Sequence, residues 1–191
     1  DVAPSRGLGD VYKRQGNTFL EAAKYLFEKA GIEYSFGEKD VRTRHNYRYP
    51  HEEPINEKEH VVDYWGKRGI SKNVIDYLDI REDSHGNGVF NFYDTNDVLT
   101  MVKYRPARTV EKHSGQPKTW CQKDADTSAL LFNMNRVNTS KPLLITEGET
   151  DCASAIEAGY INTVSVPLGA GNLHWIEENW DWLNNFESII I

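Results

Sequence analysis

Three carboxylates stand within five residues of one another near the end of the sequence. Glu147, Glu149 and Asp151 follow the apolar run at 143–146, with Gly148 between the first two. Acidic groups this close repel one another unless a cation or a bound proton offsets their charge. Mg²⁺ suits such a site, because it uses few carboxylates together with water and substrate phosphates, and paired ions can stabilise a phosphoryl transfer. The spacing therefore predicts a Mg²⁺ (or Mn²⁺) site at these three residues.

A structural explanation stays open for part of this cluster. Glu149 and Asp151 stand where a helix is expected to begin, and acids in a first turn interact favourably with the helix dipole. Glu147 precedes that helix at the end of a strand, so this explanation does not cover it, and Glu147 is the candidate catalytic residue. The Gly-Ala-Gly sequence at 169–171 would bring backbone N–H groups to a phosphate, or form a plain tight turn.

A basic stretch lies upstream, in a chain whose formal net charge is −7. Between residues 100 and 123 there are six basic residues and one acidic residue, and this local excess predicts a groove for a polyanion. Tyr104 and Trp120 would add base-stacking surfaces, although a solvated hairpin and loop would have the same composition. Two of the basic residues alternate on an expected strand and would point the same way. The candidate nucleic-acid- and NTP-binding residues are Lys103, Arg105, Arg108, Lys112, Lys118 and Lys123.

The elements that must position the acids follow from the apolar pattern after Lys141. Strands are predicted at 143–146, at 163–166 and from Ile189 onward, with helices at 151–158 and 175–183 between them. Crossovers of this length pair strands in parallel, and open parallel sheets bind ligands at the carboxyl ends of their strands. We therefore expect an α/β, Rossmann-like parallel sheet with the first acid at its mouth and the final isoleucines in a buried strand.

The preceding region is expected to be α+β. Helices are predicted at 61–69 and 72–80, with Ser71 as the N-cap of the second. Strands at 89–94 and 98–105 form a hairpin through a short polar turn, and a polar, basic loop then extends to about residue 123. Further upstream, an amphipathic helix is predicted at 18–30, and Gly31 would end it.

Several strings in these segments resemble DNA primases. L-L-I-T-E-G-E-T-D, followed by a helix and a V-S-V-P strand, looks like the first Toprim motif of primases. K-R-G-I-S ahead of a V-K-Y-R strand is similar to the N-terminal part of the polymerase domain of phage primase–helicases. G-N-T-F-L-E-A-A-K-Y-L-F-E-K-A-G-I resembles the closing helix of the zinc module at the front of DNA primases. The resemblance implies that Glu147 is a general acid/base or metal ligand, and that Lys103 and Arg105 hold template and nucleotide phosphates.

The resemblance also implies a domain organisation. A D-x-D pair that completes the family's site would follow the third strand, beyond residue 191, so we expect a fragment that is incomplete at its C-terminus and inactive alone. Zinc would belong only to the missing upstream part of the zinc module. The expected parts are a non-native or disordered segment at 1–15, the last helix of the zinc module at 16–37, a linker at 38–58, the N-terminal subdomain of the primase polymerase domain at 59–138, and the first half of a Toprim domain at 139–191.

The implied function is DNA-dependent RNA primer synthesis during DNA replication. Such a primase, of phage or prophage type, would use single-stranded DNA and NTPs and work with a replicative helicase in cis or in trans. The two cysteines share no metal-ligand spacing and indicate reduced thiols. No apolar run is long enough for a membrane span and no signal peptide opens the sequence, so the expected location is the cytoplasm, and that of the bacterial host if the protein comes from a phage. Two alternatives stay open: a Toprim nuclease or topoisomerase, and a non-catalytic Toprim module that binds DNA.

Overall fold

The computed structural model describes residues 24–25, 27–28, 31, 47–50, 57–111, 113–127 and 130–191. These residues form a four-stranded antiparallel sheet in the order β1-β2-β3-β4 and a three-stranded parallel sheet in the order β6-β5-β7. From residue 57 onward the helices and strands are α3 (Glu59–Gly66), α4 (Lys72–Tyr77), β1 (Arg81–Glu82), β2 (Asn87–Tyr93), β3 (Leu99–Pro106), β4 (Trp120–Cys121), η1 (Met134–Arg136), β5 (Leu143–Thr146), α5 (Glu149–Glu157), β6 (Thr163–Ser165), α6 (His174–Glu178), α7 (Trp180–Leu183) and β7 (Ile189–Ile190).

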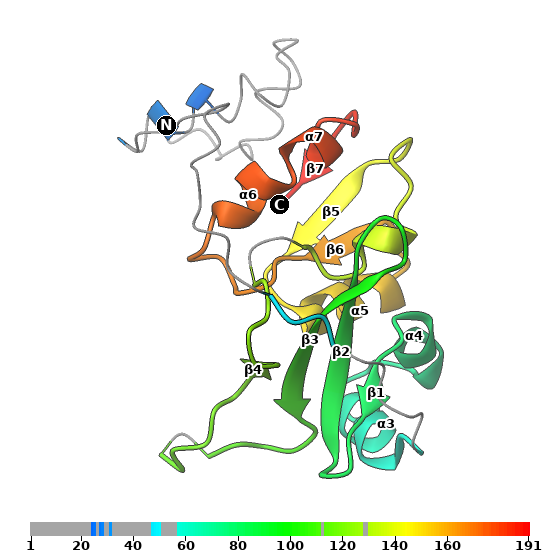
Figure 1. Ribbon diagram of the computed structural model, residues 1–191. Coiled ribbons are helices and arrows are strands. Elements are labelled where there is room, and N and C mark those ends of the chain that lie inside the picture. Colours follow the sequence, from blue (N-terminus) through cyan, green and yellow to red (C-terminus); the bar gives the residue numbers. More distant parts are fainter. Residues whose placement is uncertain are drawn as a thin grey trace, which may run out of the picture.

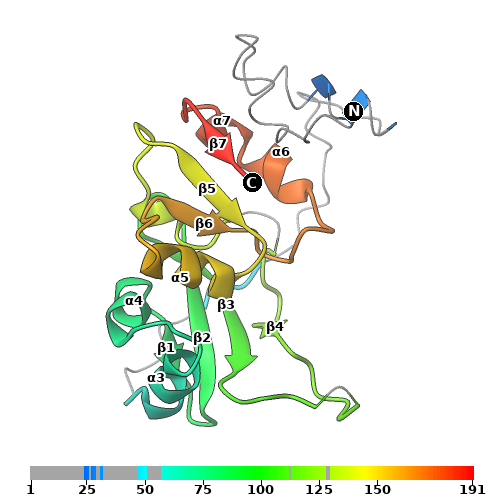
Figure 2. The same cartoon turned by 180° about the vertical axis from the view of Figure 1, so that it is seen from behind.

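The two sheets are stacked with α5 between them. In Figure 1 the antiparallel sheet and its helices α3 and α4 lie below, and the parallel sheet with α6 and α7 lies above. Seen from behind, α5 lies on the face of the parallel sheet that is turned toward β3, while α6 and α7 lie beyond the opposite face (Figure 2). The strand order explains this, because the chain leaves β5 toward one neighbour and then crosses back to the other.

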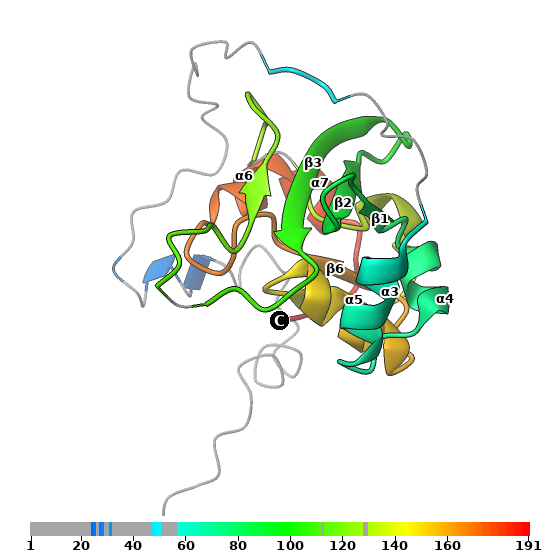
Figure 3. The same ribbon diagram turned by 90° about the horizontal axis from the view of Figure 1, so that it is seen from below.

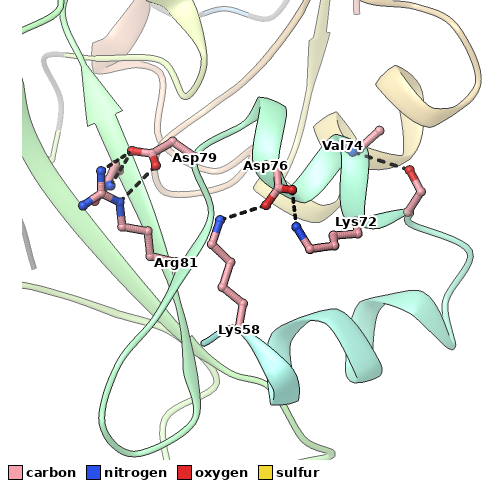
Figure 4. Close-up of polar contacts among 8 residues, drawn as sticks. Lys58, Lys72, Val74, Asp76, Asp79 and Arg81 are labelled. Carbon is pink, nitrogen blue, oxygen red and sulfur yellow. Dashed lines mark hydrogen bonds and ion pairs between the residues drawn. The ribbon is translucent and has the colours of Figure 1, made fainter. Parts of the chain in front are cut away.

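The predicted helical pair is present, with shorter bounds. Ser71 has extended backbone angles, and its hydroxyl accepts the N–H of Val74 at 3.4 Å (Figure 4), which is the expected N-cap geometry. On α3, Trp65 packs edge-to-face on Phe90 with ring centroids 5.6 Å apart. The ring also lies against the backbone of Gly88, where a Cβ would come within 2.3 Å of it. Only glycine fits at this position of β2.

The predicted hairpin is confirmed as β2 and β3, which pair antiparallel with Phe90 opposite Lys103. Two short strands that the sequence did not predict extend this sheet on either side. β1 pairs with β2, and β4 pairs with β3 by placing Cys121 opposite Lys103 and Trp120 opposite Tyr104. The basic segment expected as a loop up to residue 123 therefore returns to the sheet before it ends. Strands of two residues leave no recognisable alternation in a sequence.

The parallel sheet is confirmed, because β5 pairs in parallel with both β6 and β7. The helix expected at 175–183 is instead two short helices, α6 and α7, which meet at Asn179. The final strand is present as β7, and its last residues are exposed in this chain. Ile190 is 54% exposed and Ile191 is 87% exposed, because β7 lies at the edge of the described sheet and pairs with β5 alone.

One apolar core crosses the predicted boundary between residues 138 and 139. Phe132 packs against Phe90 and Phe92 of the antiparallel sheet, and its backbone forms a bridge with Ser165 of β6. Buried residues from both sheets belong to the same continuous cluster. At the surface, the N–H and hydroxyl of Ser71 both donate to a carboxylate oxygen of Glu157 on α5, each at 2.8 Å. The two parts are therefore packed as one body.

The N-terminal predictions fall largely outside the described residues. This holds for the segment at 1–15, most of the zinc-module helix at 16–37 and most of the linker at 38–58. Residues 24–25 and 27–28 are helical, and Gly31, with φ +66°, donates its N–H to the Glu28 carbonyl at 3.2 Å. The rest of the helix predicted at 18–30, including its last two residues, lies outside the described residues. Among the described residues, no helix has the length and apolar character needed to cross a bilayer.

Candidate functional site

Glu147 lies at the carboxyl end of β5, as predicted, and its side chain is exposed. Its carboxylate faces the loop that follows β6. A Cβ added at Gly169 would stand 3.6 Å from Glu147 Oε1. Gly169 has φ +77°, in the left-handed region that glycine adopts without strain. The tight turn predicted at 169–171 therefore brings bare backbone against the candidate catalytic carboxylate.

Asp151 lies in the first turn of α5 and is also exposed. Its Oδ2 would be 3.2 Å from a Cβ on Gly148, so the carboxylate lies over the turn that separates β5 from α5. The carbonyl of Gly148 accepts the N–H groups of Asp151 and Cys152, each at 3.0 Å. These bonds fix the first turn of α5 next to the turn between β5 and α5, which carries Glu147.

Glu149 differs from its two acidic neighbours because its side chain is buried. Its Oε1 accepts a hydrogen bond from the Lys103 ammonium at 2.7 Å, and the same ammonium donates to the carbonyl of Pro167 at 2.7 Å. The side chains of Lys103 and Glu149 are only 9% and 3% exposed. A buried charge without its partner is strongly destabilising, so each of these two residues depends on the other.

Lys103 and Arg105 point in the same direction, as predicted from their alternation on the strand. Arg105 Nη1 donates to Thr150 Oγ1 at 2.8 Å, so both basic residues of β3 reach the first turn of α5. Figure 3 shows β3 and α5 next to each other. The sequence predicted one groove lined by the basic residues and by the aromatic pair Tyr104 and Trp120. In the structure the two sets lie on opposite faces of β3. Tyr104 lies on the opposite face of the strand, where its ring stacks on Trp120 at 5.6 Å with an interplanar angle of 8°.

The remaining predicted basic residues lie beyond β3. Arg108, Lys118 and Lys123 are exposed on the segments that lead into and out of β4. Lys112 lies outside the described residues. The structure therefore brings Lys103 and Arg105 to the acidic turn and leaves Arg108, Lys118 and Lys123 in solvent.

The chemistry of the acidic turn fits a hard divalent cation held by two carboxylates. In the described part of the chain, no three acidic, histidine or cysteine side chains converge closely enough to hold a metal, since Glu149 is turned toward Lys103. Glu147 and Asp151 are exposed and have no ion-pair partner among the described residues. Mg²⁺ uses one or two carboxylates and completes its shell with water and phosphate oxygens.

The two cysteines occupy different environments. Cys121 is half-buried opposite Lys103. Burial raises the pKa of its thiol, while the Lys103 cation opposes that rise and the Glu149 carboxylate adds to it. Cys152 is fully buried in α5, and burial together with Glu149 and Asp151 raises the pKa of its thiol far above the ordinary range. Both are free thiols.

Two partners at this site were missed by the sequence interpretation. Thr150 binds Arg105 through its hydroxyl, and Pro167 binds Lys103 through its backbone carbonyl. A carbonyl exists at every position, so the V-S-V-P string carried no signal for the second contact. The contacts also join residues 45 and 64 positions apart, and only the packing of the two sheets reveals them.

Comparison with known proteins places the chain near DNA primases. No protein-family model matches it. Over 113 residues it is 26% identical to a chloroplastic/mitochondrial Twinkle homolog protein of Arabidopsis thaliana. The matched region covers 58% of this chain and 14% of that protein. The chain therefore spans only a small part of this curated relative.

Two solved structures share the architecture. A DnaG primase catalytic domain bound to single-stranded DNA superposes with a TM-score of 0.54 at 15% identity, over 72% of this chain and 56% of that chain. Primase domains in a structure of the bacteriophage T7 lagging-strand DNA polymerase, bound to an RNA/DNA hybrid and dTTP, give a TM-score of 0.52 at 26% identity, over 65% of this chain and 55% of that chain. The fold resembles the primase catalytic core, and the chain spans about half the length of each structure.

Proposed function

We propose that this chain is the central part of a DNA primase of phage or prophage type, which copies single-stranded DNA into short RNA primers from NTPs. The observation that carries the proposal is Glu147, an exposed carboxylate at the carboxyl end of a parallel strand in a primase-like fold. Sites for phosphate-bearing ligands lie at this edge of such sheets. Arg105 of β3 reaches the same edge, which favours a polyanionic substrate.

The proposed reaction joins two nucleotides. A 3′-hydroxyl oxygen attacks the α-phosphorus of an NTP, a new P–O bond forms, and the bond to the pyrophosphate leaving group breaks. Glu147 either accepts the hydroxyl proton, or holds the cation together with Asp151 while solvent water accepts the proton. Bound Mg²⁺ would neutralise the charge on the phosphate oxygens. The buried Glu149 is left out of this cation set, because its carboxylate is paired with Lys103.

The basic residues are proposed to hold the nucleic acid. Arg105 is half-buried beside α5, where its guanidinium suits phosphate recognition. Arg108, Lys118 and Lys123 are exposed and would attract the backbone of the template strand, and Lys112 belongs to the same segment. Most non-specific affinity for nucleic acids comes from such contacts. A replicative helicase, in cis or in trans, is proposed as the protein partner on the resemblance of the chain to primase–helicases, and the bacterial cytoplasm as the location.

The test is a primer-synthesis assay that measures incorporation of labelled NTPs on single-stranded DNA by the full-length protein. Glu147→Gln keeps the size of the side chain and removes its charge, so we expect synthesis to fall by about a hundredfold or more with an unchanged melting temperature. Glu187→Gln, at another exposed glutamate, is the matched control and should prime normally. Full priming by Glu147→Gln would remove this residue from the mechanism.

The same assay separates the two alternatives. A nuclease would shorten an end-labelled DNA strand and would not incorporate NTPs into it. A non-catalytic module would bind the strand and neither extend nor cleave it. The primase proposal is rejected if the wild-type protein behaves in either way.

A further inference from the structure

The ammonium of Lys103 connects the segment after β5, which carries Glu147, to the segment after β6, which the Glu147 carboxylate faces. One of its partners, Glu149, begins α5 only two residues after Glu147. The other, the Pro167 carbonyl, stands two residues before Gly169, whose backbone faces the Glu147 carboxylate. The cation is therefore hydrogen-bonded to the segment that leaves β5 and to the segment that leaves β6.

The environment of Lys103 is unlike that of a lysine that waits for a substrate phosphate. A lysine ammonium has three hydrogen-bond donors, and here at least two are used within the protein, each at 2.7 Å. The side chain is 9% exposed. Phosphate-binding lysines act as accessible point charges, whereas this ammonium is enclosed between a carboxylate and a carbonyl.

We propose that Lys103 is a positioning residue that holds the ends of β5 and β6 at the spacing which Glu147 needs, and that Glu149 is its counter-ion rather than a metal ligand. The inference rests on the proposed function, since the purpose of the spacing is to let Glu147 bind a divalent cation. Arg105 adds a parallel link from β3 to Thr150. Sites that must act with precision are commonly fixed by supporting contacts of this kind.

The first test needs no metal and no substrate. It measures amide hydrogen exchange at Cys152 and Val166, whose N–H groups donate to the Gly148 and Thr146 carbonyls at 3.0 Å beside the acidic turn. Lys103→Met retains the apolar stem and removes both bonds, so exchange at these amides should accelerate about tenfold. Lys141→Met changes an exposed lysine ahead of β5 and should leave both rates unchanged. Unchanged rates in Lys103→Met would overturn the proposal.

The second test separates positioning from phosphate binding. Mn²⁺ affinity is measured by electron paramagnetic resonance, and nucleotide affinity by the fluorescence of a methylanthraniloyl-GTP in the absence of metal. Lys103→Met should raise the Kd for Mn²⁺ by about tenfold, as loss of a supporting contact does, and change the nucleotide Kd by less than about twofold. Weaker nucleotide binding with unchanged Mn²⁺ binding would make Lys103 a phosphate ligand and overturn the assignment.

A second variant covers the case in which Lys103→Met does not fold. Glu149→Gln keeps an oxygen that accepts the Lys103 hydrogen bond but removes the counter-charge, so it should unfold at a lower temperature than wild type. Below that temperature, where circular dichroism shows the variant folded, it should bind Mn²⁺ within about threefold of wild type. A loss as large as that caused by Glu147→Gln would make Glu149 a metal ligand and contradict the proposal. If Glu147→Gln itself leaves Mn²⁺ binding unchanged, the proposed function fails, while the exchange rates still decide the role of Lys103.

Discussion

At the scale of single residues, the fold depends on charged groups whose partners come from neighbouring turns and strands. Asp79 accepts hydrogen bonds from Arg81 Nε at 3.0 Å, from Tyr93 Oη at 2.7 Å and from Asn91 Nδ2 at 3.0 Å, and Figure 4 shows the bidentate contact with Arg81. Its backbone has φ +50°, which aspartate and asparagine tolerate better than other non-glycine residues. The carboxylate thus joins β1 to the face of β2 that carries Asn91 and Tyr93.

The pKa of Asp79 gives a prediction with a defined sign. Burial raises this pKa, but the hydrogen bonds from Arg81, Tyr93 and Asn91 outweigh burial and hold it below the ordinary value of 3.8. A lowered pKa in the folded state contributes stability that is complete above that value and is lost as the pH falls through the folded pKa. We expect Asp79→Asn to lower the free energy of unfolding by about 1 kcal/mol at pH 7, after discounting for partial exposure.

Urea unfolding at pH 7 and at pH 3 checks this prediction. The difference between wild type and Asp79→Asn should shrink at pH 3, because this pH lies below the ordinary value of 3.8 and the unfolded state then binds a proton more readily than the folded state. Asp124→Asn is the matched control, because Asp124 is exposed and also has a positive φ, +58°. A gap of the same size at both pH values would show that the charge of Asp79 contributes nothing.

The candidate site was predictable at this scale only in part. An acid directly after an apolar strand and before a glycine placed Glu147 correctly, since the end of a strand is a local feature. The burial of Glu149 was not predictable, because Glu149 and Asp151 look alike in the sequence. Only the approach of Lys103, 46 positions away, distinguishes the inward acid from the exposed one.

At the scale of elements, close packing between α3 and β2 fixes how the helical pair lies on the antiparallel sheet. Trp65 is 2% exposed, and its ring occupies the space that a side chain at position 88 would need. We expect Gly88→Ala to lower the free energy of unfolding by about 1–3 kcal/mol, which is the usual effect of overpacking a core.

Chemical denaturation followed by tryptophan fluorescence measures this effect. Gly66→Ala is the control on the same helix, because nothing lies within 4 Å of a Cβ added there, and alanine favours a helix over glycine by up to about 1 kcal/mol. Equal stability of Gly88→Ala and Gly66→Ala would contradict the contact between Trp65 and β2.

The elements also show where sequence patterns stop being informative. The hairpin and the strands β5 and β6 were predicted nearly to their bounds, because each has a run of apolar or alternating residues. The strands β1 and β4 were missed because each spans two residues. The division of one expected helix into α6 and α7 was missed because apolar spacing persists across Asn179, whose buried amide donates to the Trp175 carbonyl at 2.8 Å.

At the scale of the whole molecule, the parallel sheet and the antiparallel sheet form one body around the acidic turn. The sequence predicted two successive parts but not their shared core, because nothing in the local pattern of the apolar segment around Phe132 shows what that segment packs against. In the structure this segment joins β2 to β6. The packing explains how Lys103 and Arg105 of the antiparallel sheet come to form hydrogen bonds with the first turn of α5, which follows β5 of the parallel sheet. These two basic residues lie beside the acidic turn although the chain as a whole carries a net charge of −7.

The most direct test of the central claim is a Mn²⁺ titration of the chain by electron paramagnetic resonance in the presence of GTP. If Glu147 holds a divalent cation at the carboxyl end of β5, Glu147→Gln should raise the Kd for Mn²⁺ by about tenfold or more, because a charged oxygen ligand is lost. Asp181→Asn, at an exposed acid on α7, should match wild type. Equal Mn²⁺ affinity in wild type and Glu147→Gln would contradict the claim.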